Sequence, residues 1–152
     1  MPLHGDRSII IVQPGGDACG RGGYAEKREK LSMFHKVRSE PPVKTLHVDL
    51  GAQWRGGQSQ ALLLMQGLRA LGHGVELVAV EGGVLARQAR DGGIPVHCVS
   101  RAHPRLAAAW RLARLKSDVV HCHDAHGLTA AWLAGVHRRA RLVASRDRKS
   151  VV

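Results

Sequence analysis

From Lys44 onward, short apolar runs alternate with amphipathic stretches, and glycines mark several of the junctions. The apolar runs have strand length and lie at residues 45–50, 74–80, 94–99, 119–122 and 141–144. The stretches between them repeat apolar residues at helical spacing, at residues 61–71, 84–90, 104–115 and 128–136. Strands that alternate with helices predict a parallel sheet with crossover connections. An aromatic content of only 3% also disfavours an all-β sandwich. We therefore predict an α/β fold with a doubly wound, mostly parallel, Rossmann-like sheet and helices on both faces.

The two ends of the chain lack this alternation. Residues 1–42 hold one short apolar run, residues 8–12, followed by a glycine-rich and charged stretch. Such a composition buries little apolar surface, so we interpret residues 1–42 as a poorly ordered leader with one candidate strand at 8–12. Met33 is an alternative start of the natural protein, which would make the leader non-native. Residues 43–146 form the predicted domain. The last six residues, 147–152, match one reading frame of a common sequencing adapter, so we interpret them as a non-native tail.

The chain is strongly basic. Its formal net charge is +11, and residues 43–146 hold 14 Lys or Arg against 6 Asp or Glu. Such a charge favours nucleic acids, anionic membranes or phosphorylated ligands as partners. Aromatic residues are not interleaved with the basic ones and no nucleic-acid-binding motif is recognisable, so we expect no nucleic-acid partner. A solvated, arginine-rich helix surface and a peripheral membrane contact remain as interpretations.

The expected location follows from what the sequence lacks. No apolar run reaches the roughly 18 residues of a membrane-spanning helix, and the N-terminus has no signal-peptide pattern. Cys19, Cys98 and Cys122 show no CxxC spacing, so we expect neither a disulfide framework nor a zinc knuckle. We expect a cytoplasmic protein, either free or peripheral to the inner membrane.

The loop after the first predicted strand is the first candidate site. Ligands of parallel sheets bind beyond the carboxyl ends of the strands, where helix N-termini offer free N–H groups. In this loop, Gly56 and Gly57 would let the backbone approach a ligand closely, and Arg55 could pair with a phosphate or carboxylate. The alternative is a simple tight turn, with Gln58 or Ser59 near the helix start. The loop contains neither GxGxxG nor GxxxxGK[ST], which argues against an NAD site or a P-loop.

The loop after the fourth predicted strand is the second candidate site. It carries His121, His123, Asp124 and His126 within six residues. These side chains could supply a general base, an acceptor-positioning network or metal ligands. His121 and His123 would share one face of an extended strand, so a two-histidine metal site is geometrically allowed. In the alternative, His121 is a packed strand residue and His126 lies near a helix cap. A metal-dependent hydrolase built on the four residues is a competing hypothesis, although the HxHxDH pattern is not met.

The order of these motifs resembles the N-terminal, acceptor-side domain of family 4 glycosyltransferases, which have the GT-B fold. The similar segments read LHVDLG from Leu46, GGQSQALLLMQGLRALGHGVELVAV from Gly56 and VVHCHDAHG from Val119. The resemblance extends over residues 44–145. It implies a bacterial, two-domain, retaining enzyme that transfers a sugar from a nucleotide-sugar cosubstrate to an envelope sugar, lipid or small acceptor. It implies no obligatory cofactor and no metal.

The resemblance also implies roles for individual residues. His123 matches the active-site histidine of the interdomain cleft and is our candidate catalytic residue. Gly56 and Gly57 match the glycine loop beside the donor phosphates and the acceptor. We expect Arg55, Gln58 and Asp124 to bind substrate with them. The sequence shows no counterpart of the family's C-terminal donor domain, so we expect that domain to be the missing partner and the 152 residues alone to be inactive.

Overall fold

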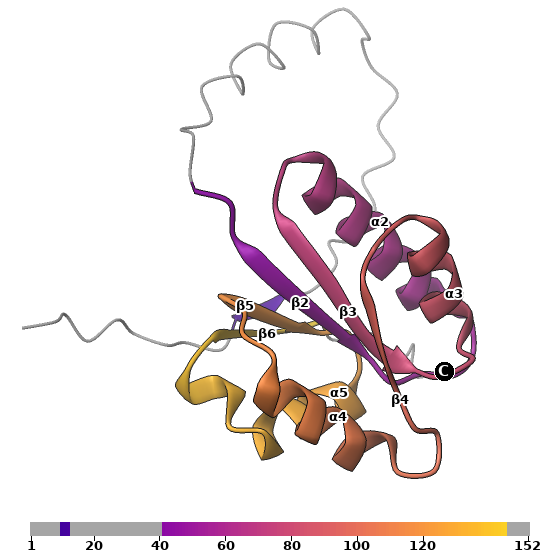
Figure 1. The fold of residues 1–152 in the computed structure, drawn as a ribbon, viewed down its shortest axis with the longest axis vertical. Helices are drawn as coiled ribbons and strands as arrows, with labels where there is room; N and C mark the ends of the chain where they lie inside the picture. The colour runs from indigo at the N-terminus through magenta and orange to yellow at the C-terminus, as the bar shows by residue number, and fades with distance from the viewer. Residues whose placement is uncertain (1–9, 13–40, 146–152) are drawn as a thin grey trace, which may run out of the picture.

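The computed structural model describes residues 10–12 and 41–145, which form a six-stranded sheet between two layers of helices (Figure 1). The strands are β1 (Ile10–Val12), β2 (Lys44–Asp49), β3 (Gly74–Val80), β4 (Val96–Val99), β5 (Val119–Cys122) and β6 (Arg141–Ser145). The helices are α2 (Gly56–Ala70), α3 (Val84–Asp91), α4 (Pro104–Arg114), α5 (Ala125–Leu133) and the 3₁₀ helix η2 (Val136–Arg138). All neighbouring strands pair in parallel, in the order β1-β6-β5-β2-β3-β4. The predicted α/β class and parallel sheet are confirmed.

The helix α5 has different bounds from those predicted, and the candidate strand near the N-terminus is present. The helix predicted at residues 128–136 begins earlier, at Ala125, because the Asp124 side chain caps it by accepting a hydrogen bond from the Gly127 amide. It also ends earlier, before Gly135, which has a φ of 65°. The candidate strand in residues 8–12 is present as β1, which pairs with β6. Residues 1–9 and 13–40 of the expected leader and the tail at 147–152 lie outside the described residues.

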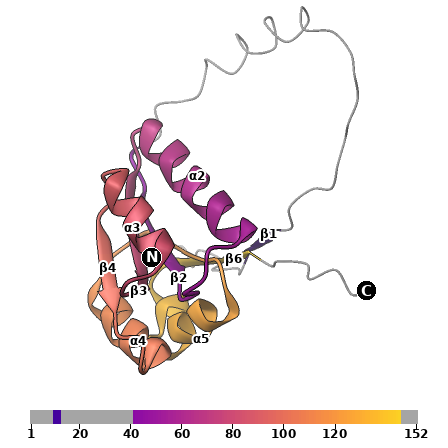
Figure 2. The ribbon, with the colours of Figure 1, turned by 90° about the vertical axis from the view of Figure 1, so that its right-hand side faces the viewer.

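The strand order reverses beside β2. From β2 the chain passes to β3 and β4 on one side, and then returns to β5 and β6 on the other side. The helices α2 and α3 cover one face of the sheet, whereas α4 and α5 cover the opposite face (Figure 2). In such doubly wound sheets the crevice between the two central strands, at their carboxyl ends, is the usual ligand site. Here that position lies between the ends of β2 and β5.

The core has a different character on the two faces of β2. Leu46, Val48 and Leu50 point toward α4 and α5 and belong to the larger apolar cluster. Strand side chains alternate between faces, so Thr45, His47 and Asp49 point to the opposite side. All three are buried although they are polar. A row of buried polar side chains therefore runs along β2 toward its carboxyl end.

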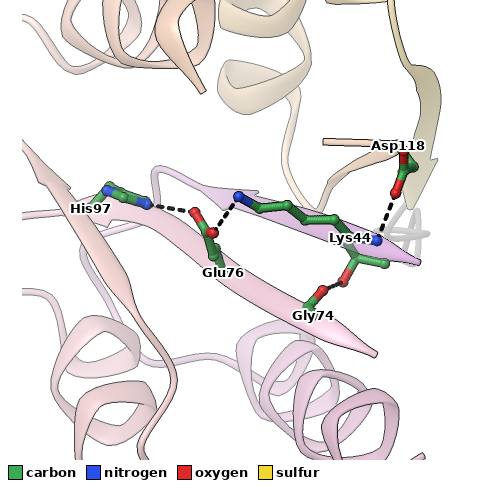
Figure 3. A network of polar contacts seen from close by, with 6 residues as sticks. Lys44, Gly74, Glu76, His97 and Asp118 are labelled. Carbon is green, nitrogen blue, oxygen red and sulfur yellow. Dashed lines mark hydrogen bonds and ion pairs between the residues drawn. The ribbon is translucent and has the colours of Figure 1, made fainter. Parts of the chain in front are cut away.

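At the other end of β2, a polar network joins the three strands of one half of the sheet. Figure 3 shows Glu76 between the Lys44 ammonium group and the His97 ring. Its Oε1 lies 2.8 Å from Lys44 Nζ, and its Oε2 lies 2.8 Å from His97 Nε2. The Lys44 amide donates to Asp118, also at 2.8 Å. Burial alone would raise the pKa of Glu76, but hydrogen bonds from Lys44 and His97 lower it. Because nearly half of the Lys44 side chain is exposed, we expect the network to fix strand register rather than to add much stability.

Among the residues described, no helix combines the length and the apolar character needed to cross a membrane.

Candidate functional site

A pocket of about 860 Å³ opens at the carboxyl ends of β2, β5 and β6. Its wall includes most of the loop after β2, the first residues of the loop after β5, and the end of β6. The lining residues that matter most for its chemistry are Asp49, Arg55, Gly57, Gln58, His123 and Asp124. Both loops predicted from the sequence therefore meet at one pocket, at the point where the strand order reverses.

The loop after β2 is fixed by a buried carboxylate. Asp49, which is 4% exposed, accepts hydrogen bonds from the Gly51 amide at 2.8 Å and from Gln58 Nε2 at 3.0 Å. Gln58 Nε2 also donates to the Gly51 carbonyl at 2.9 Å, so both of its amide hydrogens are used within the loop. Burial raises the pKa of Asp49, although these hydrogen bonds act against that rise. Although Gln58 lines the pocket, its side-chain amide therefore serves mainly to hold the loop in its conformation.

Gly56 and Gly57 form the first turn of α2. The preceding Arg55 is extended, with φ −137° and ψ 168°, and no side chain caps the helix. A Cβ atom added at either glycine would meet nothing within 4 Å. Gly57 lines the pocket, as does Arg55, which also donates to Gln53 at 2.9 Å. The open space beside Gly57 and the free amides of the helix start leave room for a ligand close to the backbone.

Asp124 ties the two loops together. Its Oδ1 accepts from the Gly127 amide at 2.7 Å and its Oδ2 accepts from the Leu50 amide at 3.2 Å. Burial raises the pKa of Asp124, the Gly127 hydrogen bond lowers it, and the nearby Asp49 charge raises it further. Each carboxylate oxygen already has a backbone partner. The contact of Asp124 with a substrate remains a prediction.

Three histidine rings gather beside the pocket. His47 is 1% exposed, and its Nδ1 lies 2.9 Å from Nε2 of His123. The His121 ring lies 4.2 Å from the His123 ring, and its Nε2 is 2.6 Å from the Ser145 hydroxyl. The sequence interpretation missed His47 and Asp49. A signal was present, because both are polar residues that alternate with the apolar Leu46, Val48 and Leu50 in a strand that ends at the predicted site.

Burial favours the neutral form of all three rings in the histidine cluster. Burial, together with a smaller effect of the neighbouring imidazoles, lowers the pKa of His47 to about 3 and that of His123 to about 2. Burial also lowers the pKa of His121. A ring with so low a pKa is a weak proton acceptor at pH 7, but it still offers one N–H donor and one lone pair.

The candidate metal ligands differ from those of the sequence hypothesis. In the described part of the chain, one ligand atom each from His47, His121 and His123 lies within 4.8 Å of the others. Neutral imidazoles of this kind suit zinc or copper. Asp124 and His126 are not members of this group, and both Asp124 oxygens already accept backbone amides. The His47–His123 hydrogen bond also occupies one of the lone pairs that a metal would need.

Comparison with known proteins gives a family and a fold. Residues 55–147 match the glycosyl transferase 4-like domain. A glycosyltransferase from Rickettsia africae ESF-5 is similar in structure, with a TM-score of 0.56 and 20% identity over 69% of this chain and 30% of that one. HepE from Anabaena, solved with UDP and glucose, has a TM-score of 0.52 and 15% identity over 64% and 28% of the two chains. MurG from Acinetobacter baumannii has a TM-score of 0.51 and 18% identity over 73% and 43%.

No curated protein matches the chain in sequence. The matched region spans less than half the length of each of these solved structures. At such low identity the likeness shows a shared fold.

Proposed function

The chain belongs to the glycosyl transferase 4-like family, and we propose that it forms the acceptor side of a retaining glycosyltransferase. The donor is a nucleotide sugar, and the acceptor is an envelope sugar, a lipid or a small molecule. The observation that carries this proposal is the pocket at the strand-order reversal, where the Gly57 loop and the His123 loop meet. The nearby histidines supply neutral hydrogen-bonding groups, which suit hydroxyl-rich ligands.

Within this proposal, the two loops have separate tasks. The amides of Gly56 and Gly57, with Arg55, face the phosphate side of the reaction. His123 positions a sugar hydroxyl, and Asp124 and Gln58 hold the loops around it. A second domain binds most of the donor, in keeping with the 28% to 43% of the similar structures that the chain matches. The 152 residues alone therefore bind saccharide weakly and do not transfer sugar.

The test is a transfer assay with the protein expressed from its native locus. It is incubated with radiolabelled nucleotide sugars and membrane extract, with and without EDTA. We expect sugar transfer that survives EDTA. The histidine cluster favours one alternative, a metal-dependent hydrolase. That alternative would gain support from stoichiometric bound zinc together with ester hydrolysis that EDTA abolishes, and the glycosyltransferase proposal would then fail.

Gly57→Ala is expected to separate substrate binding from folding. The added methyl group meets no protein atom within 4 Å, so the unfolding midpoint should not fall. The methyl would intrude on the ligand side of the loop, and one extra methyl in a fitted site costs about tenfold or more in kcat/KM. The matched control is Gly67→Ala, on the same helix and also free of Cβ contacts. Transfer is measured in the protein expressed from its native locus, and equal, measurable rates in the two variants would contradict a close approach of substrate to Gly57.

We further propose that α4 and α5 rest on an anionic membrane surface. Trp110 and Trp132 are 57% and 55% exposed, and neither helix contains an acidic residue. The Arg114 guanidinium lies over the Trp110 ring at 3.4 Å, and Arg105 is exposed on the same helix. Exposed tryptophans beside arginines are typical of surfaces that bind anionic lipid headgroups.

Sedimentation with vesicles tests the membrane proposal. We expect the chain to bind phosphatidylglycerol-containing vesicles, to bind neutral phosphatidylcholine vesicles poorly, and to dissociate as salt rises. Arg105→Gln should weaken binding about fivefold, because each basic residue near an anionic surface contributes about 1 kcal/mol. Arg87→Gln is the control, because Arg87 is exposed on α3, on the other face of the sheet. If Arg105→Gln and Arg87→Gln lose the same amount of vesicle binding, the surface of α4 and α5 is not the part of the chain that binds the membrane.

A further inference from the structure

The contact between His47 and His123 has the geometry of a hydrogen bond in the plane of both rings. The two nitrogens are 2.9 Å apart, closer than unbonded nitrogen atoms approach each other. The ring planes differ by only 9°, and the ring centroids are 5.2 Å apart. This separation fits two rings that meet edge to edge through their nitrogens. One of the two nitrogens must carry the shared hydrogen.

The surroundings of His47 decide which nitrogen carries it. His47 is 1% exposed, and its other nitrogen, Nε2, is buried without a partner among the described residues. If His47 accepted the hydrogen bond at Nδ1, its own hydrogen would be on Nε2, as a buried donor with no acceptor. If His47 donates from Nδ1, Nε2 is left as a bare lone pair. Buried N–H groups without a partner are rarer in proteins than acceptors without one, so the second arrangement is favoured.

We propose that His47 is a positioning residue that holds His123 in the tautomer with its hydrogen on Nδ1. His123 Nε2 then accepts the hydrogen bond from His47, and Nδ1 of His123 becomes an N–H donor. Nδ1 has no partner among the described residues, and His123 lines the pocket. His123 would therefore donate a hydrogen bond to a substrate oxygen, and it could not accept a proton at that atom.

The substrate part of this inference rests on the proposed glycosyltransferase function, whereas the tautomer follows from His47 alone. It gives His123 a definite role, because a neutral ring that donates N–H stabilises an oxygen lone pair or a developing negative charge. It also explains why an imidazole is buried in the middle of β2, 76 residues away in sequence from its partner. A ring without this donor could turn or exchange its hydrogen between both nitrogens.

The test is a long-range ¹H–¹⁵N correlation spectrum of the chain with ¹⁵N-labelled histidine at pH 7. We expect His123 to show a protonated Nδ1 and an unprotonated Nε2. His47→Leu removes the donor, and we expect the ratio of the two His123 tautomers to shift by about tenfold or more toward Nε2–H. His47→Asn keeps an N–H near the position of Nδ1 and should restore most of the original ratio. His103→Asn, at an exposed histidine outside the pocket, should leave the His123 signals unchanged.

Two results would overturn the inference. One is a protonated Nε2 on His123 in the unaltered chain, and the other is an unchanged tautomer ratio in His47→Leu with a folded amide spectrum. If His47→Leu does not fold, the unaltered chain and His47→Asn still decide the question. The spectra need no substrate. A failure to detect sugar transfer by the protein expressed from its native locus would therefore refute the proposed function but would leave the tautomer assignment unaffected.

Discussion

Replacing Gly127 with alanine is expected to lower the free energy of unfolding by about 3 kcal/mol. A Cβ atom at this position would lie 2.7 Å from Asp124 Oδ1, 3.0 Å from Val48 Cγ1 and 3.2 Å from the Val48 carbonyl oxygen. The contact with Asp124 would displace the carboxylate that caps α5. The two contacts with Val48 would force α5 away from the end of β2. The expected cost combines overpacking of about 1–3 kcal/mol with the loss of a cap worth about 1 kcal/mol.

Urea denaturation measures this effect. The control is Gly67→Ala, which adds the same methyl in the interior of α2 with no protein atom within 4 Å. That variant should be more stable by about 0.5–1 kcal/mol, because alanine favours a helix over glycine. If Gly127→Ala stays within about 0.5 kcal/mol of the unaltered chain, the tight packing of α5 on β2 is refuted. A large effect would also be expected to loosen both pocket loops, since Asp124 holds the Leu50 amide.

Acidification from pH 7 to pH 5 is expected to cost about 2 kcal/mol of stability for each of His47 and His123. The pKa of each ring is about 3 or 2 in the folded protein, against 6.5 as the ordinary value. The unfolded chain therefore binds more protons than the folded one below pH 6.5. The stability that the neutral rings contribute is present above pH 6.5 and is lost as pH falls toward their folded pKa. Asp49 and Asp124 act in the opposite sense, because burial raises their pKa values and the folded chain therefore takes up protons at these carboxylates before the unfolded chain does as pH falls.

Denaturation curves at pH 7, 6 and 5 check the sign and the source. We expect the urea midpoint to fall steadily across this series. In His47→Leu the dependence should be shallower, since one buried titrating ring is gone. His103→Asn, at an exposed position, should keep the original slope. A stability that is constant or that rises between pH 7 and pH 5 would show that the rings are not held neutral by burial.

The fold could be read from the sequence because its signals are local. The residues of β3 and β5 have the bounds that the apolar runs predict, and both loops at the pocket follow predicted strands. The start of α5 was missed because Asp124 is both a pocket residue and a helix cap, so its capping role was not recognised. The strand β1 is only three residues long, and the short apolar run at residues 8–12 that contains it gives a weak signal.

The site was only partly predictable, for a physical reason. Alternation along one strand places His121 and His123 on the same side, and this follows from local geometry. The partner of His123 across the sheet depends on strand order and register, which pair His47 with His121. No local pattern sets a register between segments more than 70 residues apart. The histidine pair at the centre of the site therefore appears only when the strands are placed in the sheet.

Binding of the sugar acceptor in the pocket between β2 and β5 can be followed by amide NMR. The ¹⁵N-labelled chain is titrated with a panel of methyl glycosides and, separately, with UDP-glucose. We expect at least one glycoside to shift the amide signals of residues 51–58 and 123–128 more strongly than UDP-glucose does. Gly57→Ala should weaken these shifts, and Gly67→Ala should not. Glycoside shifts that fall outside these two loops, or UDP-glucose that binds more tightly than every glycoside, would contradict binding of the acceptor in this pocket.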